Sequence, residues 1–209
     1  METVLSRAPA ASPAPPPEEV ARADFYALLA ALLHHAPDAK LLRTLALAPA
    51  LEAGEEAMAK AWDGLVAAAG VVDEEAVAEE YEALFIGVGK AKVSIYAGFY
   101  QGATPVDHPR VRIIEDLAAL GLAHAEGSPD PEDHFAGLFD AMRVLVAGGA
   151  GRAPAGLAQQ KQFFESHVKP GAGRFFAAVR EAPESNFYRR VAAVGEAFVG
   201  IEIESFNLG

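Results

Sequence analysis

Apolar residues recur along this chain at the spacing of helices. From Phe25 to Leu33 they occupy positions i, i+3, i+4, i+7 and i+8, which lie on one face of a helix. The most regular stripe falls within residues 131–147, and its members are Phe135, Leu138, Phe139, Met142, Leu145 and Val146. No alternation of useful length indicates a β-strand. The pattern therefore predicts an all-α fold.

Capping and helix-breaking residues set the predicted ends of the helices. Pro17, followed by two glutamates, favours a helix start because proline fits the first turn and acids complement the positive end of the dipole. Pro170 is expected to end a helix, and the glycine-rich residues 87–105 to form a long structured loop. The predicted elements are a helix from residue 17, helices over 38–47, 51–69, 73–87, 109–121, 131–147, 157–168 and 173–181, and a helix from residue 184. They predict a single-domain helical bundle of about eight or nine helices.

The proline- and alanine-rich residues 1–17 differ from the rest of the chain. Such a segment buries little and cannot form a helix interior, so we expect it to be disordered. Residues 18–209 are long enough for one sizeable core, and 52% of the whole chain is apolar. We therefore expect one helical domain over residues 18–209.

Cysteine usage and charge narrow the function classes. The chain has no cysteine, which excludes disulfides, thiolate metal sites and cysteine nucleophiles. Its formal net charge of −12 repels nucleic acids and attracts a basic partner, although solubility alone also explains the acidic excess. Neither a signal-peptide pattern nor the ~20-residue apolar stretch of a membrane span is present. We expect a cytoplasmic protein without membrane insertion or nucleic-acid binding.

Candidate catalytic and metal-binding residues are few. The six histidines show no HExxH spacing, and the adjacent His34 and His35 point roughly 100° apart on a helix. The segment Gly87–Lys90 lacks the spacing of a phosphate-binding loop, and Ala91 stands in place of its hydroxyl residue. A glycine-terminated helix explains that segment better. We expect no metal site and no catalytic residues.

The segment Ser128–His134 carries the most informative polar pattern. Asp130 is expected to cap the next helix, with Pro131 as its first residue and Asp133 near the free N–H groups. This cap leaves His134 unexplained, because the helix dipole disfavours a cation at the N-terminus. His134 is therefore expected to pair with Asp133 or with a ligand.

Five short motifs follow one another along the chain. They are E-Y-x-x-L-F-x-G at 80–87, S-x-Y at 94–96, P-E-D-H at 131–134, F-x-x-x-H-x-x-P at 163–170 and F-Y-x-x-x-A at 187–192. In order and spacing the chain resembles the TorD/DmsD family of NarJ-like redox enzyme maturation chaperones from about residue 20 to about residue 205. Each motif alone is weak, whereas several in order are specific.

The resemblance implies an all-helical, TorD-like chaperone rather than an enzyme. Members of the family bind the N-terminal leader and the apo-form of the catalytic subunit of a molybdopterin-dependent oxidoreductase. They hold that subunit until its cofactor is inserted and export by the twin-arginine pathway can proceed. No cofactor is implied, although weak GTP binding has been suggested for some members. Both a monomer and a homodimer, including a domain-swapped one, are compatible with the resemblance.

The leader-binding residues of the family carry over to two places in this sequence. They are Glu132, Asp133 and His134 in the P-E-D-H turn, with Ser94 and Tyr96 in the loop. Asp133 is expected to accept a hydrogen bond from a leader guanidinium, and a neighbouring apolar helix face to bind the apolar leader segment.

The loop departs from the family pattern before its S-x-Y motif. Residues 91–93 read Ala-Lys-Val where Pro-Pro-Trp is common. The aromatic wall of the leader site is therefore expected to come from Tyr96, Phe99 or Tyr100.

Three alternative functions stay open at this point. The first is a NarJ-type assembly chaperone whose client is never exported. The second is a protein that binds or hydrolyses GTP weakly through Gly87–Lys90. The third is a helical interaction module with a structural role only.

Overall fold

Helices make up most of the described part of the chain. The computed structural model describes residues 15–51, 55–87, 91–102, 109–123, 130–149 and 151–208. These residues form nine continuous helical stretches and no strand, which confirms the all-α prediction. The helices are α1 (Pro17–His34), α2 (Ala39–Ala46), α3 (Glu56–Ala69), α4 (Glu74–Tyr81), α5 (Ala97–Tyr100), α6 (Pro109–Ala119), α7 (Phe135–Ala147), α8 (Leu157–Phe163), α9 (Lys169–Glu181) and α10 (Phe187–Leu208).

Two π-helical segments join some of these helices into longer ones. The segment η1 (Glu82–Ile86) continues α4, and η2 (Phe164–Val168) connects α8 directly to α9. Among the described helices, none is long and apolar enough to cross a membrane. Residues 1–14, most of the predicted disordered segment, lie outside the described residues, as do residues 88–90 and 103–105 of the glycine-rich loop.

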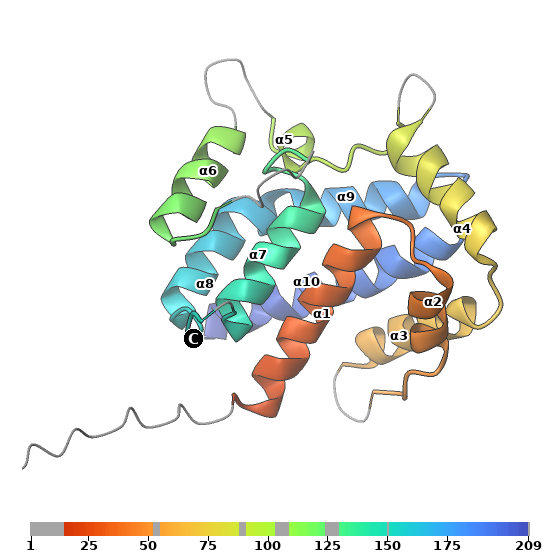
Figure 1. The fold of residues 1–209 in the computed structure, drawn as a ribbon, viewed down its shortest axis with the longest axis horizontal. Helices are drawn as coiled ribbons and strands as arrows, with labels where there is room; N and C mark the ends of the chain where they lie inside the picture. Colours follow the sequence, from red (N-terminus) through yellow and green to blue (C-terminus); the bar gives the residue numbers. More distant parts are fainter. Residues whose placement is uncertain are drawn as a thin grey trace, which may run out of the picture.

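Helix α1 lies at the centre of the bundle. It packs along α7 over most of its length, and α10 lies behind the pair (Figure 1). Helix α9 packs on α10, whereas α2 and α3 form a smaller layer at one end, where α3 also contacts α10. The short α5 and the helix α6 lie on the opposite side of α7 from α3 (Figure 1).

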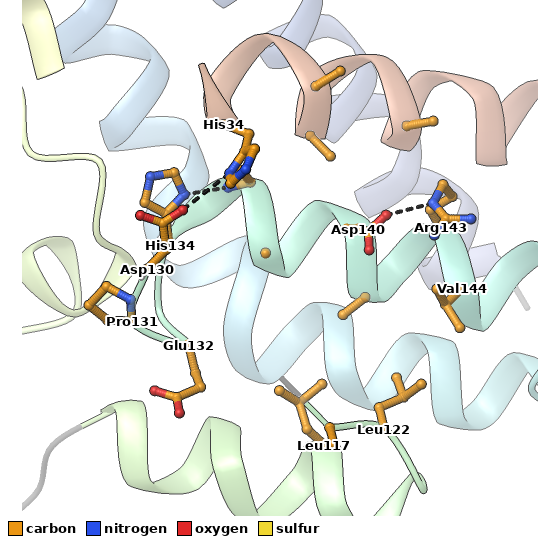
Figure 2. A pocket seen from close by; sticks show the side chains of 17 residues that line it. His34, Leu117, Leu122, Asp130, Pro131, Glu132, His134, Asp140, Arg143 and Val144 are labelled. Carbon is orange, nitrogen blue, oxygen red and sulfur yellow. Dashed lines mark hydrogen bonds and ion pairs between the residues drawn. The ribbon is translucent and has the colours of Figure 1, made fainter. Parts of the chain in front are cut away.

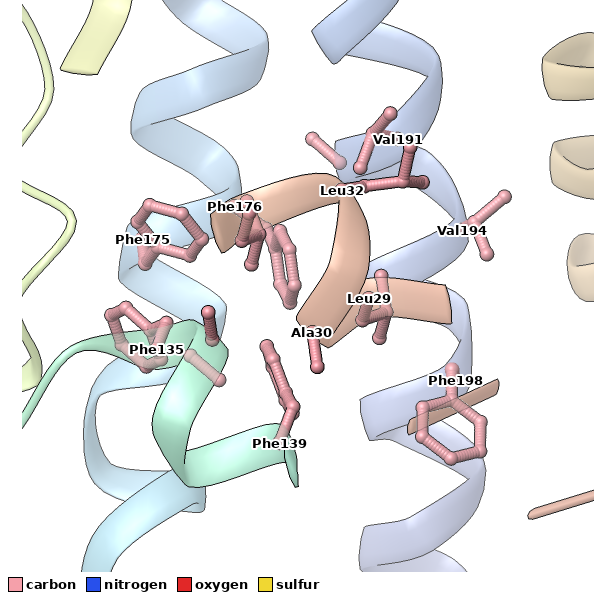
Figure 3. Packing of buried hydrophobic residues seen from close by; sticks show 14 of the residues in the cluster. Leu29, Ala30, Leu32, Phe135, Phe139, Phe175, Phe176, Val191, Val194 and Phe198 are labelled. Atoms are coloured by element: carbon pink, nitrogen blue, oxygen red, sulfur yellow. The ribbon is translucent and has the colours of Figure 1, made fainter. Parts of the chain in front are cut away.

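Aromatic rings fill the space between α7 and α9. Phe135 of α7 stacks on Phe175 at 4.4 Å between ring centroids, and Phe139 stacks on Phe176 at 6.0 Å (Figure 3). The predicted stripe of α7 is buried at every position. A Cβ atom at Gly195 would overlap the ring of Phe176, so glycine lets α10 approach α9 closely.

The E-Y and F-Y motifs form one structural unit. The Glu80 carboxylate accepts hydrogen bonds from the backbone N–H groups of Asn186 (2.8 Å), Phe187 (3.0 Å) and Tyr188 (2.7 Å). It thereby caps α10 at its positively polarised end. The hydroxyls of Tyr188 and Tyr81 donate to the last backbone carbonyls of α1. These contacts fix the end of α1 relative to α4 and α10.

A buried ion pair joins the other end of α1 to α10. The guanidinium of Arg22 donates two hydrogen bonds of 2.8 Å to the carboxylate of Glu202, which is fully buried. The Tyr26 hydroxyl donates a third, at 2.7 Å. These three charge-assisted hydrogen bonds offset part of the free energy that it costs to bury the carboxylate of Glu202.

Pro170 does not end a helix, contrary to the sequence prediction. Helix α9 begins at Lys169 and places Pro170 in its first turn, directly after η2. In η2 the backbone N–H of Lys169 donates to the carbonyl of Phe164, which is five residues earlier. The wider turn accommodates a residue that has no N–H, so the chain stays helical from Leu157 to Glu181.

The predicted loop over 87–105 and the predicted start of α7 also need correction. Residues 97–100 form the short helix α5, and α7 begins at Phe135 rather than at residue 131. Both differences arise from one tertiary contact, since the backbone of residues 133–135 pairs with that of residues 95–97. Local sequence patterns carry no information about such a pairing.

Candidate functional site

A backbone bridge connects the S-x-Y loop to the P-E-D-H turn. The N–H of Ala97 donates to the carbonyl of Asp133 at 2.8 Å, and the N–H of Phe135 donates to the carbonyl of Ile95 at 3.1 Å. The two hydrogen bonds form an isolated antiparallel bridge between Tyr96 and His134. Two motifs about forty residues apart in the sequence therefore meet at the start of α7.

Asp133 lies inside this junction. Its side chain is buried, and its carboxylate accepts a hydrogen bond from the N–H of Gly98 at 3.3 Å. Gly98 is in the first turn of α5, so the carboxylate caps that helix. This is a different position from the open acceptor for a guanidinium that we expected from the sequence.

His134, rather than Asp130, caps α7. Its Nδ1 atom accepts a hydrogen bond from the N–H of Ala136 at 3.1 Å, which requires that nitrogen to be unprotonated. Burial lowers the pKa of His134, and the nearby His34 adds to this effect, while Asp130 and Asp133 oppose it. A neutral imidazole that accepts a hydrogen bond is compatible with the helix dipole, so the N-cap itself explains His134.

Of the three residues predicted to form the aromatic wall of the leader site, Tyr96 and Phe99 are exposed and Tyr100 is buried. The ring of Tyr96 meets that of His134 edge-on at 5.5 Å and is 38% exposed, while Phe99 is 71% exposed. Tyr100 is buried, and its hydroxyl donates to the backbone carbonyl of Ser94 at 2.8 Å. Burial raises the pKa of Tyr100 to about 12, so the hydroxyl stays a donor. Tyr100 and Ser94 thus hold the loop, and Tyr96 and Phe99 face outward.

A groove opens beside this junction, between α1, α6 and α7. It has a volume of about 430 Å³, and its walls are mainly apolar (Figure 2). The α1 wall presents Ala27, Ala30 and Ala31, and the α7 wall presents Ala136 and Gly137 among other small residues. Small side chains on both walls let the backbone of a bound segment approach α1 and α7 closely. The remaining apolar lining residues are Leu117, Leu122, Ala123, Pro131, Ala141 and Val144.

Three carboxylates line the rim of the groove. Asp130 pairs with Nδ1 of His34 on α1 at 3.1 Å, and Asp140 pairs with Arg143 of α7 at 2.6 Å (Figure 2). Glu132 forms an ion pair with Arg110 of α6. Each carboxylate already has a side-chain partner in the described structure, so an incoming guanidinium would exchange with or join that partner.

The sequence-predicted residues contribute to the groove unequally. Glu132 and His134 line it, whereas Asp133, Ser94, Tyr96, Phe99 and Tyr100 are absent from its described lining. Of the latter residues, Tyr96 lies against His134 at the edge of the groove.

Sequence reasoning missed the α1 wall and the Asp130–His34 pair. A signal for them was present, because Ala27, Ala30, Ala31 and His34 are spaced i, i+3, i+4 and i+7 and so share one helix face. The large apolar residues of the same helix mark its core face. A second face of small residues is the pattern that identifies a groove wall.

No group of three or more ligating side chains that could hold a metal ion occurs within the described ranges. Two of the six histidines, at positions 108 and 124, lie outside those ranges.

Comparison with known proteins identifies the class of molecule. The family described as nitrate reductase delta subunit matches residues 51–177 of this chain. Over 164 residues, the chain is 29% identical to the chaperone protein TorD of Ferrimonas balearica, covering 78% of this chain and 73% of that protein.

The matching family and the TorD relative define this protein as a helical chaperone and not as an enzyme. The chain belongs to the nitrate reductase delta subunit family, and the TorD-like resemblance of its motifs is confirmed. A role in the maturation of a molybdoenzyme follows from this membership.

The neutral cap at His134 predicts a pH-dependent stability. Because burial holds the pKa of His134 below its ordinary value of 6.5, the unfolded chain binds more protons below that pH. The free energy of unfolding should therefore fall as the pH is lowered from about 8 to about 6, where most carboxylates stay ionised. His134→Asn keeps an N-cap acceptor but cannot titrate, so it should reduce this slope.

Urea unfolding at a series of pH values measures the effect. The matched control is His35→Asn, the same substitution at an exposed histidine. The buried His167, whose pKa is also lowered by burial, should supply the slope that remains in His134→Asn. A slope identical in His134→Asn and in the unsubstituted protein would contradict the neutral cap.

Proposed function

We propose that this chaperone binds the N-terminal leader of the catalytic subunit of a molybdenum oxidoreductase in the groove between α1, α6 and α7. It would hold the apo-subunit in the cytoplasm until the cofactor is inserted and the twin-arginine pathway can export it. The observation that carries the proposal is the pairing of a small-residue, apolar groove with an acidic rim. A twin-arginine leader has the complementary order of a basic patch followed by an apolar segment.

The apolar part of the leader would supply most of the affinity. A helical segment that lies against Ala27, Ala31 and Gly137 would lose water from its apolar face, at ~25 cal/mol per Å². Part of that gain is offset by the entropy lost when a flexible leader becomes ordered. Helix-in-groove binding of this kind selects a segment by apolar positions at i, i+3, i+4 and i+7.

The rim would select the basic patch and orient the leader. Asp130 and Glu132 lie at the end of the groove next to the P-E-D-H turn, so the arginine pair is expected there. The apolar segment that follows would then extend along α7 towards Val144 (Figure 2). The net charge of −12 would also raise the encounter rate with a basic leader.

The residues predicted from sequence fit this proposal in two roles. Tyr96 is partly exposed beside His134, which lines the groove, so it can contact the flanking part of the leader. The exposed Phe99 on α5 would join it there. Asp133, Ser94 and Tyr100 would act indirectly, by holding α5 and its loop in place.

Filling the groove should block binding without harming the fold. Gly137→Leu adds a side chain on the groove side of α7, where a Cβ meets no atom within 4 Å. We expect about tenfold weaker binding of a synthetic twin-arginine leader peptide. The free energy of unfolding should rise by about 0.5–1 kcal/mol, because leucine has the better helix propensity.

Gly200→Leu is the matched control, because Gly200 is an exposed helical glycine of α10 with equally open surroundings. It should give the same gain in stability and unchanged affinity in calorimetry. Equal affinities for Gly137→Leu and Gly200→Leu would remove the groove from the leader site.

Neutralising the rim should weaken binding in an arginine-dependent manner. We expect Asp130→Asn with Glu132→Gln to reduce affinity about fivefold, because partly exposed ion pairs contribute ~0.2–1 kcal/mol each. The control Glu56→Gln with Asp63→Asn removes the same charge from exposed positions on α3 and should have little effect.

A second leader peptide with both arginines replaced by alanine completes this experiment. The rim variant and the unsubstituted protein should bind that peptide equally. If the unsubstituted protein bound both peptides with one affinity, recognition of the arginine pair would be excluded. The NarJ-type alternative, with a client that lacks the motif, would then be favoured.

A further inference from the structure

The F-x-x-x-H-x-x-P motif has no role in the groove itself. Its histidine, His167, lies in η2 and is buried, with 2% of its surface exposed. The Nε2 atom of His167 is 2.7 Å from the carboxylate of Asp116 on α6. The motif therefore reaches from the long helix α8–η2–α9 to the wall of the groove.

Asp116 is adjacent to the groove-lining part of α6. The next residue, Leu117, lines the groove, and Leu122 follows just beyond the helix. Ile113 is the fully buried apolar anchor of α6. A displacement of α6 at Asp116 would thus change the width of the groove directly.

Apolar packing alone does not fix α6 at this point. A second cavity, of about 150 Å³, separates α6 from α8 and is lined by Asp116, Leu120 and Phe163 among others. Because the two helices are not closely packed there, the contact between Asp116 and His167 spans the edge of a gap. A short, directional hydrogen bond fixes the separation of two helices where loose packing does not.

The protonation state of His167 suits this contact. Burial lowers the pKa of His167, while the hydrogen bond to Asp116 opposes the shift. A neutral ring with hydrogen on Nε2 donates to the carboxylate, so the contact persists without a charge on His167. The ring is also held edge-on by Phe163 at 4.8 Å between centroids.

We infer that His167 is a positioning residue for leader binding: through Asp116 it holds α6 at the spacing from α1 and α7 that admits a leader helix. The inference rests on the proposed function of the groove. It assigns to the F-x-x-x-H-x-x-P motif a role in setting the shape of the site.

Substitutions on both sides of the contact test this inference. His167→Ala should weaken binding of the twin-arginine leader peptide about fivefold and speed hydrogen exchange of the α6 backbone amides. His167→Gln can place its amide N–H near the position of Nε2, so it should restore affinity to within about twofold. Restored leader affinity in His167→Gln would show that binding needs the hydrogen bond to Asp116 and not only the buried volume of the His167 side chain.

Asp116→Ala removes the other side of the same contact. Because Asp116 is partly exposed, this variant should fold even if His167→Ala does not. It should match His167→Ala, and the two substitutions together should weaken binding no further. Asp116→Asn keeps an acceptor oxygen and should bind like the unsubstituted protein.

The outcomes separate this inference from the proposed function. If Gly137→Leu weakens leader binding while Asp116→Ala does not, the groove is the site and His167 has no positioning role. If Gly137→Leu binds normally, both ideas fail together. Additive losses in the double variant, or no rescue by His167→Gln, would likewise overturn the inference.

Discussion

The arrangement of the site depends on two backbone hydrogen bonds, between Ala97 and Asp133 and between Phe135 and Ile95. They are the contact that brings the S-x-Y loop to the start of α7. Once they form, His134 is extended, and α7 can begin only at Phe135 with His134 as its cap. The same bridge directs the Asp133 carboxylate into α5 and leaves Asp130 and Glu132 facing the groove. The placement of Asp130 and Glu132 on the acidic rim is therefore a consequence of the bridge.

The remaining motifs support the groove from outside it. Glu80 and Tyr188 fix α10 and the end of α1, so the wall with small residues has a defined position. Arg22 and Glu202 fix the other end of α1. His167 reaches the opposite wall through Asp116. Motifs that lie far apart in the sequence thus all help to fix the positions of the helices that form the groove.

Local pattern was sufficient to predict most of the helices, because their apolar stripes and caps are contained in a few neighbouring residues. The stripe of α7 and the start of α1 at Pro17 are examples. Features that depend on distant contacts were not predictable. Pro170 reads as a helix breaker until η2 accommodates it, and Glu202 reads as a surface residue until Arg22 pairs with it. His134 was expected to pair with Asp133 or with a ligand, because its neutral, accepting form follows only from burial.

A leader that lies between α1, α6 and α7 must contact those helices, so mapping the contacts of a bound peptide tests the proposed binding site. A synthetic twin-arginine leader peptide with a photoreactive residue in its apolar segment would be cross-linked to the full chain, and the products located by mass spectrometry. We predict cross-links to residues of the two small-residue walls, such as Ala31 and Gly137. Cross-links confined to other surfaces, such as the exposed Leu47 and Val71 next to α2 and α3, would contradict the account.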